Sequence, residues 1–133
     1  MTRAITNRCY LDANILIYFL DDQSPQHPES VQLIGALINQ RAEILISPLS
    51  LDETIYSLKK IALIEKIRDF YPRLSKAIKN IFLLPNISII NPPIEPKYHL
   101  RIINLMEKYG LRPRDAYHLL TMKHHKIKFF ATF

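Results

Sequence analysis

The chain has 133 residues, of which 48% are hydrophobic, so it is long enough for one domain with a buried core. Its 18 Lys and Arg residues outnumber its 12 Asp and Glu residues, and the net charge of +6 favours a polyanionic partner such as RNA or DNA, or an acidic protein. Two glycines are too few for the turns of a β-sandwich or barrel, and no apolar run is long enough to predict a membrane span.

The start of the chain and its single cysteine indicate where the protein works. Residues 1–8 contain charges but no apolar segment of the kind that a secretory signal requires. Cys9 lies in the first apolar run, where we expect a buried thiol in a reducing compartment. We therefore expect a cytoplasmic protein without a membrane partner. The positive charge has a second interpretation, since a basic surface also serves solubility alone.

Short apolar runs alternate with helical patterns along the whole chain. In chain order the pattern predicts a strand at 9–11, helices at 15–20 and 28–39, a strand at 44–46, helices at 50–62 and 64–84, a strand at 87–90, helices at 96–109 and 113–124, and a strand at 128–131. Pro28 and Pro113 fit first helical turns, Pro72 interrupts the segment at 64–84, and Gly110 fits a helix C-terminal cap.

Strands that are short, apolar and separated by helices indicate a parallel sheet covered on both faces. We therefore predict an α/β fold, namely a three-layer α/β/α sandwich with a central, mostly parallel sheet of about four short strands. The chain shows no internal repeat and no interdomain linker, so residues 1–133 are expected to form a single domain.

Three acidic residues lie where a strand ends or a helix begins. Asp12 follows the first strand, Glu53 lies near the start of the helix after the second strand, and Asp115 lies near the start of the helix before the fourth. These positions can converge on one edge of a parallel sheet. Carboxylates brought together repel one another, and a hard divalent cation such as Mg²⁺ or Mn²⁺ removes that cost. With a basic surface for nucleic acid, the pattern predicts a metal-dependent nuclease.

Each acid also has a purely structural interpretation. Ser50 and Glu53 have the spacing of a helix capping box, and Asp115 complements a helix dipole. Asp12 and Asn14 could shape a turn through side-chain bonds to the backbone. A phosphatase of the haloacid dehalogenase type also has an Asp after its first strand, but Asn14 stands where that family needs a second Asp. The three acids taken together favour the metal site.

Four segments resemble, in order and spacing, the motifs of PIN-domain ribonucleases. They are Leu-Asp-Ala-Asn-Ile-Leu-Ile-Tyr at 11–18, Ser-Pro-Leu-Ser-Leu-Asp-Glu-Thr at 47–54, Arg-Pro-Arg-Asp-Ala-Tyr-His-Leu-Leu at 112–120 and Phe-Phe-Ala-Thr at 129–132. The resemblance covers nearly the whole chain. Among PIN proteins, the small single-domain size is similar to that of the VapC-type toxins of toxin–antitoxin pairs.

The resemblance implies that Asp12, Glu53 and Asp115 are catalytic and bind one or two Mg²⁺ or Mn²⁺ ions, with Asn14 supporting the first acid. It also implies an endoribonuclease that hydrolyses RNA phosphodiester bonds, a homodimer, and an antitoxin whose tail occupies the cleft. Arg112 and Arg114 flank the third acid and are candidates for RNA contacts, with solvated surface charge as the equal alternative.

The chain departs from the family pattern at its end. Family members commonly carry a fourth acid directly after the position of Phe133, followed by a final helix and strand. On this pattern we expect the site to bind metal better than it cuts. The alternative is a non-catalytic PIN-like module that binds RNA or protein through a degraded active site. His118, one turn beyond Asp115, could face the cleft, but it is expected to be a satisfied surface or core histidine. Asp52 is expected to be a surface residue.

Overall fold

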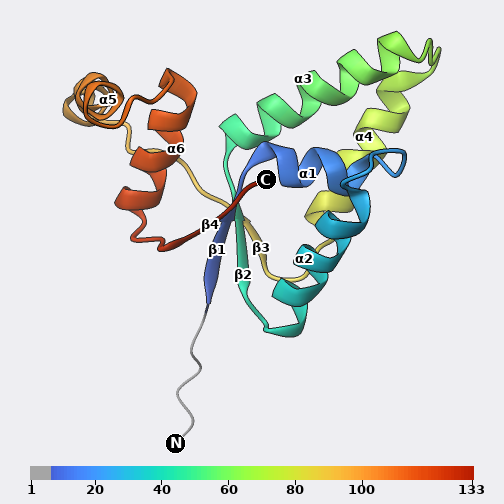
Figure 1. Ribbon diagram of the computed structural model, residues 1–133, viewed down its shortest axis with the longest axis horizontal. Coiled ribbons are helices and arrows are strands. Elements are labelled where there is room, and N and C mark those ends of the chain that lie inside the picture. Colours follow the sequence, from blue (N-terminus) through green and yellow to red (C-terminus); the bar gives the residue numbers. More distant parts are fainter. Residues whose placement is uncertain (1–6) are drawn as a thin grey trace, which may run out of the picture.

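The computed structural model describes residues 7–133, and its centre is a four-stranded sheet (Figure 1). The elements are β1 (Arg8–Leu11), α1 (Ala13–Leu20), α2 (His27–Asn39), β2 (Glu43–Ile46), α3 (Pro48–Ile64), α4 (Phe70–Phe82), β3 (Ile87–Ile89), α5 (Pro96–Tyr109), α6 (Pro113–His124) and β4 (Phe129–Ala131). Residues 1–6, on which the expectation about a secretory signal rests in part, lie outside the described residues.

The strands have the order β3-β2-β1-β4, and each neighbouring pair is parallel. Helices α1, α2 and α4 lie on one side of the sheet, and α5 and α6 lie on the other (Figure 1). The predicted three-layer α/β/α architecture is confirmed. Within the described residues, no helix combines the length and the apolar character that crossing a membrane requires.

The two central strands are buried on both faces, which explains their continuous apolar sequences. Leu11 of β1 packs on one face with Ile34 of α2, whereas Tyr10 and Leu45 pack on the other face. Successive side chains of a strand point to opposite faces, so β1 and β2 each contribute to two cores. Cys9 is buried as predicted, and burial raises the pKa of its thiol.

The predicted helical segment at residues 64–84 is wrong in its boundaries. Helix α3 continues to Ile64, Lys66 has a positive φ of 55°, and α4 begins only at Phe70. Pro72 lies in the first turn of α4, where its missing N–H has no partner within the helix to lose. The two helices form a hairpin that extends away from the sheet (Figure 1).

The carboxyl ends of the two central strands place the starts of α1 and α3 at the same edge of the sheet. β1 and β2 are paired in parallel, so they end at the same edge of the sheet. β1 passes through Asp12 directly into α1, and β2 passes through Ser47 into α3. The last residues of the chain also lie beside the start of α1, because the Asp12 N–H donates to the Ala131 carbonyl over 2.9 Å.

The stability of this arrangement depends on the buried strand residues. We expect Leu45→Ala to lower the free energy of unfolding by about 2–5 kcal/mol, because Leu45 is fully buried and its truncation leaves a cavity. Leu100→Ala is the matched control, since Leu100 is 73% exposed and should cost less than about 0.5 kcal/mol. Urea unfolding measures both values, and similar losses would contradict the placement of the core.

Candidate metal centre

Asp12 caps the N-terminus of α1 and is held on both carboxylate oxygens. Its Oδ1 accepts a hydrogen bond from the Ala13 N–H over 2.7 Å, and its Oδ2 accepts one from the Thr132 hydroxyl over 2.8 Å. A carboxylate at this position also complements the positive end of the helix dipole. Asp12 is therefore an oriented, half-buried anion at the edge of the sheet.

Asn14 lies one residue inside α1 and is linked to Asp12 through Thr132. Its Nδ2 donates to the Thr132 hydroxyl oxygen over 3.1 Å, and its Oδ1 accepts from the Phe133 N–H over 3.4 Å. Because Thr132 in turn donates to Asp12, the amide of Asn14 fixes the group that orients the acid. Asn14, whose expected role is to support Asp12, is therefore linked to it through Thr132.

Glu53 faces the same edge from α3. Its Oε1 lies 3.2 Å from His118 Nε2 and 3.3 Å from Arg114 Nε. The capping-box interpretation of Glu53 is wrong, because α3 begins at Pro48 and its cap is Ser47, whose Oγ accepts from the Ser50 N–H over 3.2 Å. The Glu53 side chain is only 16% exposed, so its carboxylate points inward from the helix.

His118 belongs to this group, although the sequence favours a satisfied surface or core histidine at this position. It is buried on α6, its Nε2 contacts Glu53, and its Nδ1 is hydrogen-bonded to the Tyr10 hydroxyl. It is a satisfied histidine, as expected, but one of its two partners is a site carboxylate. The available signal was its spacing of three residues from Asp115, which places both residues on neighbouring positions of one helical face.

Tyr10 is the buried partner that orients His118. The residue is fully buried in β1, and its hydroxyl lies 2.6 Å from Ser47 Oγ. Burial raises the pKa of the Tyr10 hydroxyl, while the hydrogen bonds from Ser47 and Ser50 oppose that rise. Tyr10 therefore stays protonated at neutral pH and can donate or accept a hydrogen bond, but it does not carry charge.

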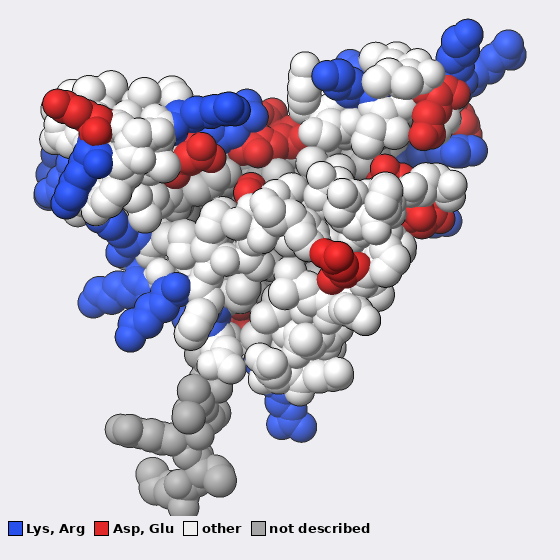
Figure 2. All heavy atoms as spheres, in the orientation of Figure 1, with Lys and Arg blue, Asp and Glu red and all other residues white. Residues whose placement is uncertain are grey.

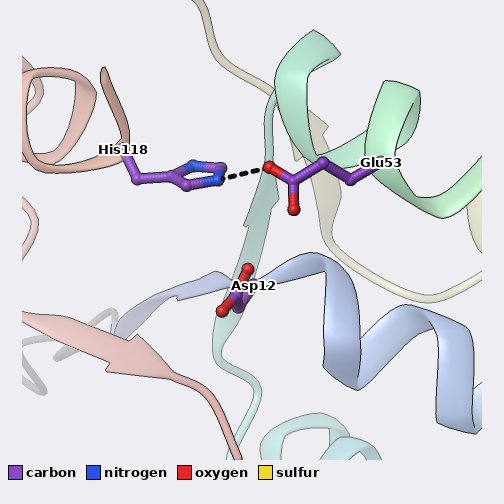
Figure 3. A group of neighbouring side chains, drawn as sticks. All are labelled: Asp12, Glu53 and His118. Atoms are coloured by element: carbon purple, nitrogen blue, oxygen red, sulfur yellow. Dashed lines mark hydrogen bonds and ion pairs between the residues drawn. The ribbon is translucent and has the colours of Figure 1, made fainter. Parts of the chain in front are cut away.

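Asp12, Glu53 and His118 together form a group that could hold one cation (Figure 3). One ligand atom from each residue lies within 4.8 Å of the others. On an octahedral ion with bonds of about 2.1 Å, neighbouring ligand atoms lie about 3 Å apart and opposite ones about 4.2 Å apart. The second carboxylate oxygen of Glu53 points toward Asp12 (Figure 3), so two anionic oxygens and one imidazole nitrogen face a common space.

The remaining predicted residues lie on α6 at the rim of this group. Asp115 is exposed in the first turn, and it is not one of the residues whose ligand atoms converge. Arg114 is bonded to Glu53, whereas Arg112 is exposed at the N-cap position. Figure 2 shows acidic side chains in a recess between α6 and α3, with basic side chains beside them on the α6 side.

Comparisons with known proteins agree with this fold. The family described as PIN domain matches residues 9–133. Among solved structures, VapC20 of Mycobacterium tuberculosis, a sarcin-ricin loop cleaving toxin, has a TM-score of 0.64 at 11% identity, over 94% of this chain and 88% of that chain. No curated protein matches the chain in sequence.

Two further structures are similar at low identity. VapBC2 of Rickettsia felis, bound to a DNA fragment from their promoter, has a TM-score of 0.59 at 15% identity, over 94% of this chain and 86% of that chain. FitAcB of Neisseria gonorrhoeae has a TM-score of 0.54 at 19% identity, over 93% and 86%. At these identities the likeness is one of fold.

The environment of Tyr10 predicts an unusual titration. Tyrosinate absorbance should show Tyr10 ionising at a higher pH than an ordinary tyrosine, whose pKa is about 10. The difference curve between wild type and Tyr10→Phe isolates this residue, and Tyr56→Phe is the control because Tyr56 is 68% exposed. Since the unfolded chain ionises first, the contribution of Tyr10 to stability is complete below pH about 10 and is lost above it. Equal midpoints for both tyrosines would contradict the assignment.

Proposed function

Because the chain belongs to the PIN domain family, we propose that it is a metal-dependent endoribonuclease and the toxin of a toxin–antitoxin pair. One observation carries the chemical part of this proposal. Asp12 and Glu53, which come from separate elements and are 41 positions apart, converge with His118 on one small space. Two carboxylates at the carboxyl edge of a parallel sheet are a natural cation site.

The cation of this site is proposed to be Mg²⁺ or Mn²⁺, held by Asp12 and Glu53. When bound, such an ion supplies Lewis-acid chemistry, since it lowers the pKa of a water molecule and offsets negative charge on a phosphodiester. The chain's own residues prepare the site. Thr132 orients Asp12, and His118 and Arg114 orient Glu53.

Asp115 and the two flanking arginines complete the proposal. Asp115 stands one turn before His118 on α6, and we include it as the third catalytic carboxylate, acting from the rim. Arg112 is exposed beside it and is proposed to contact RNA phosphates. Arg114 is proposed to do the same while its Nε remains near Glu53, since a guanidinium has further N–H donors.

The distribution of charge supports RNA as the substrate. Residues 95–128, which include α5 and α6, contain eight of the 18 Lys and Arg residues but three of the 12 Asp and Glu residues, so they carry +5 of the net charge of +6. Within them, Lys97 and Arg101 lie over the Tyr98 ring, 5.0 and 5.1 Å from its centroid. Cations and aromatic rings side by side are what single-stranded nucleic acid binds.

The biological setting is inferred from the structural relatives. VapC20 is a toxin that cleaves the sarcin-ricin loop, and VapBC2 was solved on a DNA fragment from the promoter. By analogy of fold, we propose that this chain acts in the cytoplasm, forms a homodimer and is inhibited by a cognate antitoxin. The basic surface of the protein and its acidic recess are two different surfaces on which a second copy of the chain and an antitoxin could bind.

The nuclease activity can be tested with isosteric changes. Asp12→Asn and Glu53→Gln should each lower Mn²⁺-dependent cleavage of total bacterial RNA by at least about 100-fold, because each removes an anionic ligand. Asp52→Asn is the matched control, since it removes the charge of the exposed neighbouring acid. Asp115→Asn reports separately on the rim carboxylate.

The same assay distinguishes the alternative function. A non-catalytic binding module would cleave no RNA with or without Mn²⁺, yet it would still shift RNA or a partner protein in a mobility assay. Cleavage that survives Asp12→Asn unchanged would place the chemistry elsewhere.

The basic surface of α5 predicts how RNA binding depends on salt. In an Asp12→Asn background, the double change Lys97→Gln with Arg101→Gln should weaken binding of a single-stranded RNA. It should also make the slope of log K against log salt less negative by about 1.4, or about 0.7 per phosphate contact. Lys76→Gln with Lys79→Gln is the control, since it removes the same charge from exposed positions of α4. Equal effects of the two pairs would show that charge alone, and not this surface, binds RNA.

A further inference from the structure

We propose that the His118 imidazole is a direct nitrogen ligand of the cation, and that it makes this site prefer Mn²⁺ to Mg²⁺. The inference rests on the proposed function, because it concerns the ion held by Asp12 and Glu53. The ion would then be bound by both oxygen and nitrogen atoms of the protein, and not by carboxylates and water alone.

The first argument is the position of the imidazole. His118 Nε2 lies 3.2 Å from Glu53 Oε1, and Asp12 supplies an oxygen within 4.8 Å of both. A separation of 3.2 Å fits a hydrogen bond, but it equally fits two neighbouring ligand atoms on one octahedral ion, which lie about 3 Å apart. The His118 side chain is 5% exposed, so the ring is packed in place rather than free to turn away.

The second argument concerns the protons of the buried network. His118 binds a cation through Nε2 only if its proton is on Nδ1, which faces the Tyr10 hydroxyl. Tyr10 can accept that proton's hydrogen bond if it donates to Ser47, which lies 2.6 Å away. Ser47 can then donate to Ser50 over 3.2 Å, and Ser50 donates to the Leu11 carbonyl over 3.3 Å. Every donor in this series of hydrogen bonds has an acceptor.

The same network serves the opposite tautomer. With the proton on Nε2, His118 donates to Glu53, Tyr10 donates to Nδ1, and Ser47 donates to Tyr10. With either tautomer of His118, every hydroxyl of this group keeps a hydrogen-bond partner. His118 Nε2 can therefore exchange its hydrogen bond for a metal bond without leaving a buried polar group unsatisfied. Tyr10 is thus a positioning residue, because it acts on the ion only through the ring of His118.

The third argument is the chemistry of the donor. Mg²⁺ strongly prefers oxygen ligands and gives up its waters reluctantly. Mn²⁺ also suits carboxylates and is the weakest of the first-row transition metals for nitrogen, but as a transition metal it accepts an imidazole nitrogen more readily than Mg²⁺ does. A buried imidazole fixed beside two carboxylates therefore raises the affinity for Mn²⁺ much more than that for Mg²⁺. The basis of selection is the one nitrogen atom in the group.

Metal binding to the chelator-treated full chain tests the proposal without any nuclease assay. Calorimetry with Mn²⁺ alone and with Mg²⁺ as competitor should give at least about tenfold tighter binding of Mn²⁺ to wild type. His118→Gln should lose about tenfold or more in Mn²⁺ affinity and less than about threefold in Mg²⁺ affinity. Tyr10→Phe should also lower the affinity for Mn²⁺. His124→Gln, an exposed histidine of the same helix, should change neither.

Pulsed electron paramagnetic resonance of the Mn²⁺-loaded wild type adds a direct readout that needs no variant. A nitrogen-14 modulation of the Mn²⁺ signal, lost in His118→Gln and kept in His124→Gln, is the expected result. If Mn²⁺ binds without a nitrogen signal and the Mn²⁺ to Mg²⁺ ratio is the same in His118→Gln, the inference is wrong while the proposed function stands. If wild type binds neither ion, both are wrong.

Discussion

The hydrogen bonds of the buried Tyr10 hydroxyl are the constraint on which the geometry of the site depends. Tyr10 belongs to the central strand β1, and its hydroxyl is bonded to Ser47 at the start of α3 and to His118 on α6. A buried hydroxyl without partners destabilises the fold, so the sheet and both helices adopt the arrangement that satisfies it. That arrangement brings Glu53 and His118 above the end of β1, where Asp12 lies. The core and the candidate metal centre therefore share one polar network.

Much of the fold could be predicted because its signals are local. The strands are runs of apolar residues, and prolines at the starts of α2, α3, α5 and α6 mark helix beginnings. The missed boundary between α3 and α4 has a physical reason. Arg41, Lys66 and Lys126 adopt a positive φ after helices, a conformation usually marked by glycine. The chain has only two glycines, so a glycine marks the helix end at Gly110 and no glycine marks the other helix ends.

The candidate site could be predicted from the sequence only in part, and for a different reason. Asp12 and Glu53 follow strands of one parallel sheet, so their convergence follows from topology alone. The position of His118 beside Glu53 depends on contacts with Tyr10 and Glu53, which are 108 and 65 positions away, and on the rotation of α6 about its axis. The same rotation leaves Asp115 exposed at the rim. Neither a spacing rule nor a charge pattern contains that information, whereas the fold provides it.

The central claim is that Asp12 and Glu53 hold a divalent cation at the carboxyl edge of the sheet. Anomalous scattering from a crystal of the protein soaked in Mn²⁺ tests it most directly. The account predicts one strong peak in the anomalous difference map, about 2 Å from carboxylate oxygens of both Asp12 and Glu53. A map without a peak at this position, or with Mn²⁺ bound only at other carboxylates, would contradict it.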